Sequence, residues 1–422
     1  MALKNETAPM STIRKLRVLT RELATPEGFD ITQHLPPNPT TFIRNGQGLI
    51  GFGEAARFET SGQNRIAELA SFWRDQVEQS EITDPLQVQG SSLVGFGSAT
   101  FSPDTNMNSV LIVPRIILGT RDGRSWITKI TPEGDQEATA DFYSKVISYA
   151  ENKKLSFVEG SMTSAGFLKQ AEKAISKIRS GKLQKVVLAR EIMAQLQQDF
   201  DIRTGLQALS KRYPSCWVYS VAGNFGASPE LLVRVSHGQV SARVLAGTTS
   251  RGDSPESDVQ KSNALVASAK NLAEHRFAVV SMVEALSPFC LTVDSDEKPF
   301  SLALPDLWHL ASDVYGKLKN NISVLDLAAF LHPTAAVAGT SRADAQALIA
   351  ELEPFDRGGY AGPVGWIGAD GDGEWAIALR GGYIEENILT AFAGCGLVAD
   401  SEPAAELEET ELKFAPVRGA LS

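Results

Sequence analysis

Cysteine is scarce in this chain, with three among 422 residues. Cys216, Cys290 and Cys395 lack the spacing of metal-ligating cysteines, and an odd, sparse set is typical of proteins kept in a reducing compartment. We therefore expect a cytoplasmic protein.

Long hydrophobic runs are also missing. No stretch approaches the length of a membrane span, and residues 1–20 lack the apolar segment of a signal peptide. The net charge of −10 argues against a nucleic-acid or anionic-membrane partner. We therefore expect neither a nucleic acid nor a membrane as a partner. If this acidic protein binds an anion, its positive groups must be concentrated at the binding site.

The chain does have enough apolar residues, 43% of the total, to bury a large core. Its length alone suggests two or three domains. However, no linker rich in glycine, proline or charge interrupts residues 40–422. We therefore expect one domain over residues 1–422, with two halves of related architecture.

The N-terminal portion is expected to be rich in strands. Residues 1–25 are predicted to be a polar lead-in, and SFWRDQVEQ around Phe72 to be a helix. Gly-Phe-Gly occurs at 51–53 and at 95–97, but neither copy leads into a helix of a βαβ unit, so turns at strand ends are expected rather than a nucleotide site. Strands or hairpins are predicted over 42–59, 91–101, 109–120 and 125–130.

Helices and strands alternate after residue 160. An amphipathic helix is predicted over 164–182, and a long helix from about Lys261 to Leu286, with Glu274 opposite its buried stripe. Residues 305–318 are expected to be a strand or an irregular edge segment. The remaining predictions are strands over 185–191, 216–223 and 388–396, helices over 202–212 and 323–331, and hairpins over 223–248 and 360–384.

The C-terminal stretch 393–414 carries a cluster of charges. Asp400 and Ser401 are predicted as helix caps, and Glu406, Glu409 and Lys413 then share one arc of the helix. Two carboxylates on one face repel unless a positive group lies between them, and a lysine or Mg²⁺ would meet that need. A solvated acidic face explains the same pattern, and the stretch alone favours it.

Five other residues have both a functional and a structural interpretation. Glu274 is set among small side chains, which suits a cavity wall or solvent. Lys185 is a surface strand end or, if desolvated, a base. Glu230 is a turn carboxylate or an acid, Arg380 a strand end or a carboxylate clamp, and His309 a packed histidine or a site residue.

The joint order of the motifs resembles the chorismate-utilising enzymes and, within them, the isochorismate synthases. The resemblance covers roughly residues 160–415. The matching motifs are KVVLARE (185–191), GASPELL (226–232), LAGT (245–248), KNLAEH (270–275), LWHL (307–310), LHPTAAVAG (331–339), FDRGGYAGPVGW (355–366), GDGEWAIALR (371–380) and AGCGLVADSEPAAELEETELK (393–413).

The resemblance implies a fold. It implies a mixed α+β domain, in which two mainly antiparallel sheets pack as a core with helices outside. Residues 1–160 would be a divergent N-terminal portion and residues 161–416 the chorismate-binding catalytic portion. A monomer is expected, because the family's members are commonly monomeric.

The resemblance also implies roles for particular residues. Lys185 would activate water for attack at C2 of chorismate, Glu230 would protonate the departing C4 hydroxyl, and His309 would lie beside the C1 carboxylate. Glu274 and Glu409 would hold Mg²⁺, with Glu406 supporting it through water. The residues expected to bind or line the substrate are Gly247, Thr248, Ala336, Val337, Tyr360, Arg380, Gly394 and Lys413.

Single positions select among the branches of the family. Lys185 favours water over ammonia as the nucleophile, and Ala246 and Ala336 argue against the aminodeoxychorismate and salicylate synthase branches. Val337 and Asn271 depart from the pattern of several relatives. The expected activity is reversible, Mg²⁺-dependent conversion of chorismate to isochorismate for menaquinone, which we favour, or for a siderophore. A salicylate synthase and a non-catalytic subunit remain the alternatives.

Overall fold

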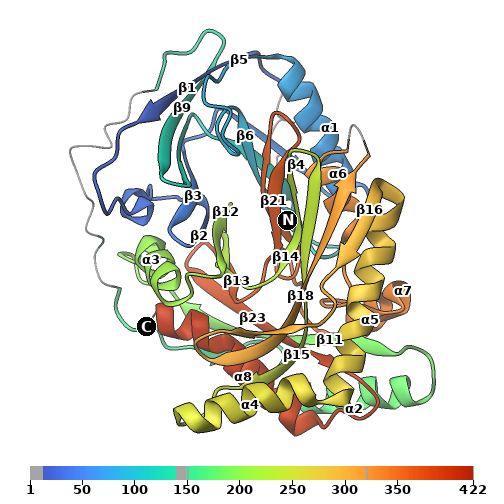
Figure 1. Ribbon diagram of the computed structural model, residues 1–422. Coiled ribbons are helices and arrows are strands. Elements are labelled where there is room, and N and C mark those ends of the chain that lie inside the picture. Colours follow the sequence, from blue (N-terminus) through green and yellow to red (C-terminus); the bar gives the residue numbers. More distant parts are fainter. Residues whose placement is uncertain (1–12, 139–148, 150–151, 320–321, 422) are drawn as a thin grey trace, which may run out of the picture.

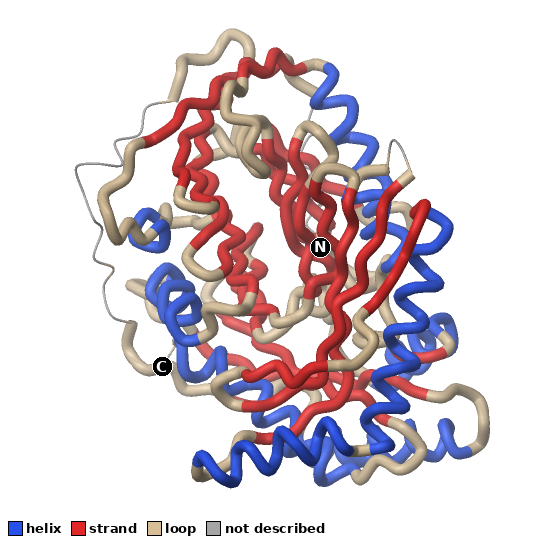
Figure 2. Tube along the Cα trace, viewed as in Figure 1, coloured by secondary structure: helices blue, strands red, loops and turns tan. Residues whose placement is uncertain are grey.

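The computed structural model describes residues 13–138, 149, 152–319 and 322–421, with the exception of the side chains of residues 270 and 274. Its strands form two large sheets (Figures 1 and 2). All pairings between described strands are antiparallel except that of β1 (Leu16–Leu23) with β5 (Ser80–Thr83). The expected α+β fold with two mainly antiparallel sheets is confirmed.

The first sheet contains thirteen of the described strands. β19 (Gly339–Thr340) pairs with β11 beside the main path. That path runs β10 (Val158–Glu159), β11 (Lys185–Gln195), β23 (Ile388–Leu397), β22 (Gly381–Glu385), β13 (Asn224–Ser228), β12 (Trp217–Val221), β2 (Thr40–Arg44), β3 (Gln47–Phe52), β8 (Ile116–Arg121), β9 (Arg124–Pro132), β1 and β5.

The second sheet contains ten of the described strands. β17 (Phe300–Ala303) pairs with β18 beside the main path. That path runs β16 (Cys290–Ser295), β18 (Leu307–Leu318), β15 (Gln239–Ser250), β14 (Leu231–Ser236), β21 (Gly373–Ile377), β20 (Pro363–Gly368), β6 (Val94–Ser98), β7 (Ser109–Val113) and β4 (Ala56–Thr60). Strands from before and after residue 160 share both sheets, so neither portion forms a sheet of its own.

Helices cover the outer faces of the sheets (Figures 1 and 2). The second sheet is contacted by α1 (Arg65–Glu78), α4 (Pro255–Ala267), α5 (Ala269–Leu286) and α6 (Val324–Leu331). The first is contacted by α2 (Ser164–Arg179), α3 (Ile202–Arg212), α7 (Arg342–Leu352) and α8 (Pro403–Ala420). None of the described helices is both long enough and apolar enough to cross a membrane.

In the amphipathic helix α2, the spacing of apolar residues in the sequence determines which face of the helix is buried. Its apolar side chains recur every three or four residues, so they lie on one face of the helix. All five that the pattern predicts are buried, namely Phe167, Ala171, Ala174, Ile175 and Ile178. The helix therefore packs against β11 and β23, two strands that carry residues of the candidate site described below.

Three local predictions were wrong, and for a fourth segment one of two alternatives was right. The part of the lead-in that is described contains β1, in which Leu16 and Val18 are buried against β9. The long helix predicted from 261 to 286 is broken at Ser268, where the backbone is extended. The Ser268 hydroxyl accepts a hydrogen bond from the Asn271 N–H and so caps α5. Residues 307–318 form a strand, β18, as one of the two alternatives had it, and this strand lies inside the sheet rather than at its edge. At α8 the N-cap is Glu402, and Ser401 instead accepts a hydrogen bond from the Val398 N–H.

Candidate active site

The candidate site lies where the chain passes from one sheet to the other. One corner joins β13 to β14 and carries Glu230, and the other joins β21 to β22 and carries Arg380. The corners are hydrogen-bonded together, since the Ala227 N–H donates to the Arg380 carbonyl (3.3 Å) and the Ile377 N–H to the Glu230 carbonyl (3.1 Å). Two candidate site residues that are 150 residues apart in the sequence are thereby held close together.

A cavity of about 200 Å³ opens at these corners, and we call it the site cavity. Every predicted site residue whose side chain is described lines it. They are Lys185, Glu230, Gly247, Thr248, His309, Ala336, Val337, Tyr360, Arg380, Gly394, Glu406, Glu409 and Lys413.

Glu274 is the remaining predicted residue, and its side chain lies outside the part of the chain that the structure describes. Its helix, α5, is described. Asn271 of this helix lines the site cavity, and Ala278 and Ser281 line a second cavity beside it. These positions follow the 3.6-residue period, so position 274 falls on the same helix face.

Lys185 begins β11, and its side chain lies over the neighbouring strand β23. A Cβ atom added to Gly396 would lie 2.7 Å from Cε of Lys185 and 3.3 Å from its Nζ. Glycine at 396 therefore leaves the space that the lysine side chain occupies.

Glu230 is buried, with 7% of its surface exposed. Burial raises the pKa of its carboxyl to about 7, although Lys185, Arg380 and Lys413 act in the opposite direction. A carboxylic acid with this pKa is substantially protonated near neutral pH. Glu230 can therefore donate a proton to a group bound in the cavity.

Arg380, His309 and Thr248 form a chain of hydrogen bonds along one wall. Arg380 Nη2 lies 3.1 Å from His309 Nε2, and His309 Nδ1 lies 3.0 Å from Thr248 Oγ1. Burial, with the charges of Arg380 and Lys413, holds the pKa of His309 well below its usual value. The imidazole is therefore neutral and accepts one of the hydrogen bonds that the Arg380 guanidinium can donate.

The backbone of this wall is also specialised. Arg380 has a φ of 51° and so lies in the left-handed region that side chains other than glycine seldom adopt. Thr248 pairs with His309 only after a register shift that follows Leu245. Such departures from regular structure are often found at functional sites.

The opposite wall is formed by Tyr360, Gly394 and α8. A Cβ atom at Gly394 would lie 3.2 Å from the Tyr360 hydroxyl. Lys413 Nζ donates to the Gly394 carbonyl (2.7 Å) and contacts Glu409 Oε1 (2.5 Å).

Glu406 and Glu409 differ in the direction of their pKa shifts. Burial opposes ionisation of both, but Lys413 lowers the pKa of Glu409 overall. Burial and the Glu409 charge raise the pKa of Glu406, partly offset by the Ser401 hydrogen bond. The two carboxylates thus share one lysine, and a second cation would stabilise the ionised pair.

Comparison with known proteins places this geometry in a family. The family described as chorismate binding enzyme matches residues 14–422. The chain belongs to the chorismate-binding enzymes.

Several relatives in this family are named isochorismate synthase. The chain is 31% identical to isochorismate synthase MenF of Bacillus subtilis over 401 residues, covering 88% of this chain and 85% of the relative. It is 37% identical to isochorismate synthase DhbC of the same organism over 255 residues, covering 58% and 64%. A crystal structure of a protein described as a 2,3-dihydroxybenzoate-specific isochorismate synthase, DhbC from Bacillus anthracis, is 29% identical with a TM-score of 0.75, covering 92% of this chain and 98% of that one. The structure of MenF from Escherichia coli, at 24% identity with a TM-score of 0.78, covers 99% and 97% and shares the fold.

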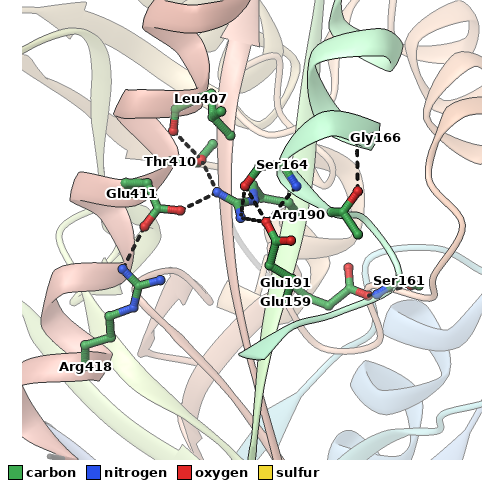
Figure 3. Close-up of polar contacts among 11 residues, drawn as sticks. Glu159, Ser161, Ser164, Gly166, Arg190, Glu191, Leu407, Thr410, Glu411 and Arg418 are labelled. Carbon is green, nitrogen blue, oxygen red and sulfur yellow. Dashed lines mark hydrogen bonds and ion pairs between the residues drawn. The ribbon is translucent and has the colours of Figure 1, made fainter. Parts of the chain in front are cut away.

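In this chorismate-binding enzyme α8 is fixed to β11 by a buried arginine (Figure 3). Arg190 is 1% exposed in its side chain and donates to Glu411 (2.5 Å), Thr410 (3.4 Å), Ser164 (3.1 Å) and Glu159 (3.3 Å). Thr410 and Glu411 directly follow Glu409. The Arg190 cluster therefore sets the position from which α8 presents its carboxylates to the cavity.

Arg357 is a lining residue that the sequence analysis missed as a site residue. Its guanidinium is buried, pairs with Glu353 (2.6 Å), and donates to the carbonyls of Val337 (3.0 Å) and Val187 (2.8 Å). It thus ties the 336–337 segment to β11. The residue lies in the motif FDRGGYAGPVGW and is the one basic residue of that motif, which was the signal that could have identified it.

Proposed function

We propose that this chorismate-binding enzyme is an isochorismate synthase, which converts chorismate reversibly into isochorismate. The observation that carries the proposal is the pairing of a lysine with a carboxylic acid of raised pKa, Lys185 and Glu230, in one cavity. The names of the relatives described above support the same activity.

The cavity suits a dianionic substrate. Arg380 and Lys413 supply positive charge in a protein whose net charge is −10, and the Tyr360 hydroxyl, whose pKa burial raises to about 12, stays protonated as a donor. Charge-assisted hydrogen bonds of this kind bind and orient carboxylates. Chorismate carries two carboxylates.

The chemistry then divides between two residues. Lys185 takes a proton from the water that attacks C2, and Glu230 gives its proton to the C4 oxygen as that bond breaks. The ring double bonds shift between the two carbons, and water leaves. The reverse reaction exchanges the two roles.

Mg²⁺ is the proposed cofactor, held by Glu274, Glu406 and Glu409. The two described carboxylates fit a hard cation, because both line the cavity, both offer oxygen ligands, and both lie beside the same lysine of α8, Lys413. The described side chains contain no group of three metal-ligating residues. Glu274 and waters would supply the other ligands. When bound, the ion would neutralise a substrate carboxylate.

The deciding experiment incubates the purified protein with chorismate and Mg²⁺ and separates the products. Isochorismate is the expected product, and added ammonia should yield no aminated product. Salicylate with pyruvate would establish a salicylate synthase, and absence of turnover would establish a non-catalytic chorismate-binding protein.

Lys185→Gln should abolish turnover while chorismate still quenches or shifts the tryptophan fluorescence. Retained turnover in this variant at high pH would remove Lys185 from its role as the base.

A further inference from the structure

A second cavity lies directly behind Glu230, and we call it the rear cavity. Glu230 and Ala336 line both cavities, so these two residues form part of the wall between them. The other residues that line the rear cavity are Val244, Ala278, Ser281, Met282, Ala285, Leu331, Thr334, Ala335 and Arg342.

The rear cavity reaches from the interior to the surface. Glu230 is buried, whereas Arg342, which also lines the cavity, is exposed. The volume is about 50 Å³, which exceeds the 10–15 Å³ that one water molecule requires. The rear cavity therefore has room for a short row of waters.

Polar groups are present to hold these waters. The Thr334 Oγ1 atom is buried and has no hydrogen-bond partner among the described residues. A buried hydroxyl without a protein partner calls for a bound water. Ser281 supplies another hydroxyl to the lining, between the apolar residues of α5.

The proposed reaction requires such a route. Each forward turnover leaves Glu230 as a carboxylate, because its proton leaves with the C4 oxygen as water, and leaves Lys185 as an ammonium. Before the next turnover Glu230 must gain one proton and Lys185 must lose one. While substrate or product fills the site cavity, solvent can reach Glu230 from the side of the rear cavity, which Glu230 also lines.

We infer that the rear cavity is a water-filled proton path that reprotonates Glu230 from solvent, with Thr334 as its central hydrogen-bonding residue and Arg342 at its mouth. This inference rests on the proposed isochorismate synthase activity. Thr334 acts through water on Glu230, and it is therefore a positioning residue for the proton path.

The test compares Thr334→Val with wild type in light and heavy water. The substitution keeps the shape of the side chain and removes only its hydroxyl. We expect kcat to fall about tenfold, which is less than the 10²–10⁴-fold effect of losing an acid outright, because other waters still reach Glu230. KM should be unchanged, and the solvent deuterium isotope effect on kcat should increase.

A second variant blocks the rear cavity by volume. Ala278→Leu places a larger side chain in the cavity and should lower kcat with the same increase in the isotope effect, while Ala273→Leu, on the exposed side of α5, should behave as wild type. If both cavity variants keep the wild-type kcat and isotope effect, the proton path is wrong. A rise in KM alone would overturn it too, by assigning the cavity to the substrate. If the wild-type protein does not convert chorismate to isochorismate at all, the proposed function is wrong, and the proton path, which rests on it, is overturned with it.

Discussion

The guanidinium of Arg380 donates a hydrogen bond to Nε2 of His309, with 3.1 Å between the two nitrogens. Arginine has no acceptor, so Nε2 must carry the lone pair and Nδ1 must carry the proton. Nδ1 lies 3.0 Å from the Thr248 hydroxyl oxygen, and the ring also donates to the backbone of Gly247. We expect the ¹⁵N chemical shifts of His309 to report this tautomer without titration between about pH 6 and 8, where an ordinary histidine changes charge.

Removing the acceptor should weaken substrate binding. In His309→Leu the Arg380 guanidinium loses its partner, and we expect KM for chorismate to rise about tenfold, the size of one charge-assisted hydrogen bond. His309→Gln keeps an acceptor for Arg380 and a donor for Thr248, so it should retain most of the wild-type affinity. Equal KM values in the two variants would show that the hydrogen bond does not orient Arg380.

A methyl group at Gly396 should displace the proposed base without unfolding the protein. The added Cβ would lie 2.7 Å from Lys185 Cε, which belongs to a flexible side chain that can move aside. We expect Gly396→Ala to lower kcat by about 10²-fold or more, the usual contribution of a positioned base, while the unfolding midpoint changes little. The matched control is Gly419→Ala on the exposed end of α8, where the nearest atom is 3.9 Å away. Wild-type kcat in Gly396→Ala would show that the position of Lys185 is not critical.

The pKa of Glu230 predicts one limb of the pH profile. The carboxyl must be protonated to act as an acid, and its pKa is raised to about 7, so it is protonated below that pH and ionised above it. We expect kcat/KM to fall as pH rises through about 7. Difference infrared spectra of wild type and Glu230→Gln should contain a carboxyl band that titrates near the same pH. A band that disappears near pH 4 to 5, where an ordinary glutamate ionises, would exclude this assignment.

Much of the candidate site could be predicted because several of its charged residues lie in short sequence motifs. Glu406, Glu409 and Lys413 were placed on one helix arc from their spacing, and all three line the site cavity. The same period predicted the buried side of α2. Whether that acidic arc faced water or a cavity was not decided by spacing, because the answer depends on β23, which packs beneath α8.

Long-range pairing explains what the sequence analysis missed. β1 has the alternation of a strand, with Leu16, Val18 and Thr20 buried, yet its partner β9 is about 100 residues away and the segment carries several charges. Arg357 was not singled out, because two of its partners, the carbonyls of Val337 and Val187, come from other segments of the chain. The hydrogen bonds between the Glu230 and Arg380 corners are equally non-local.

The Arg190 cluster should contribute to stability far more than the neighbouring surface pair. Glu411 contacts both Arg190, whose side chain is 1% exposed, and Arg418, whose side chain is 40% exposed. We expect Arg190→Met to lower the free energy of unfolding by about 1–3 kcal/mol, less than for a wholly buried pair because Glu411 and Glu159 are half exposed. Arg418→Met is the matched control and should cost at most about 1 kcal/mol. Urea unfolding of both variants measures the difference, and equal losses would contradict a special role for Arg190.

Metal binding at α8 can be tested without relying on turnover. Glu409 lines the site cavity, whereas Glu408, its neighbour on the same helix, is exposed. Replacing either by glutamine removes one negative charge from α8, so a general electrostatic effect would be alike in both variants, whereas the loss of a ligand would be confined to Glu409→Gln. We expect Glu409→Gln to weaken Mn²⁺ binding, followed by electron paramagnetic resonance, by about 10–100-fold or more, since even residues that only support a ligand often contribute that much. Glu408→Gln should bind Mn²⁺ as wild type does. Lys413 already contacts Glu409, so a bound ion would share this carboxylate with the lysine. Equal Mn²⁺ affinities in the two variants would show that Glu409 pairs with Lys413 and does not bind the metal ion.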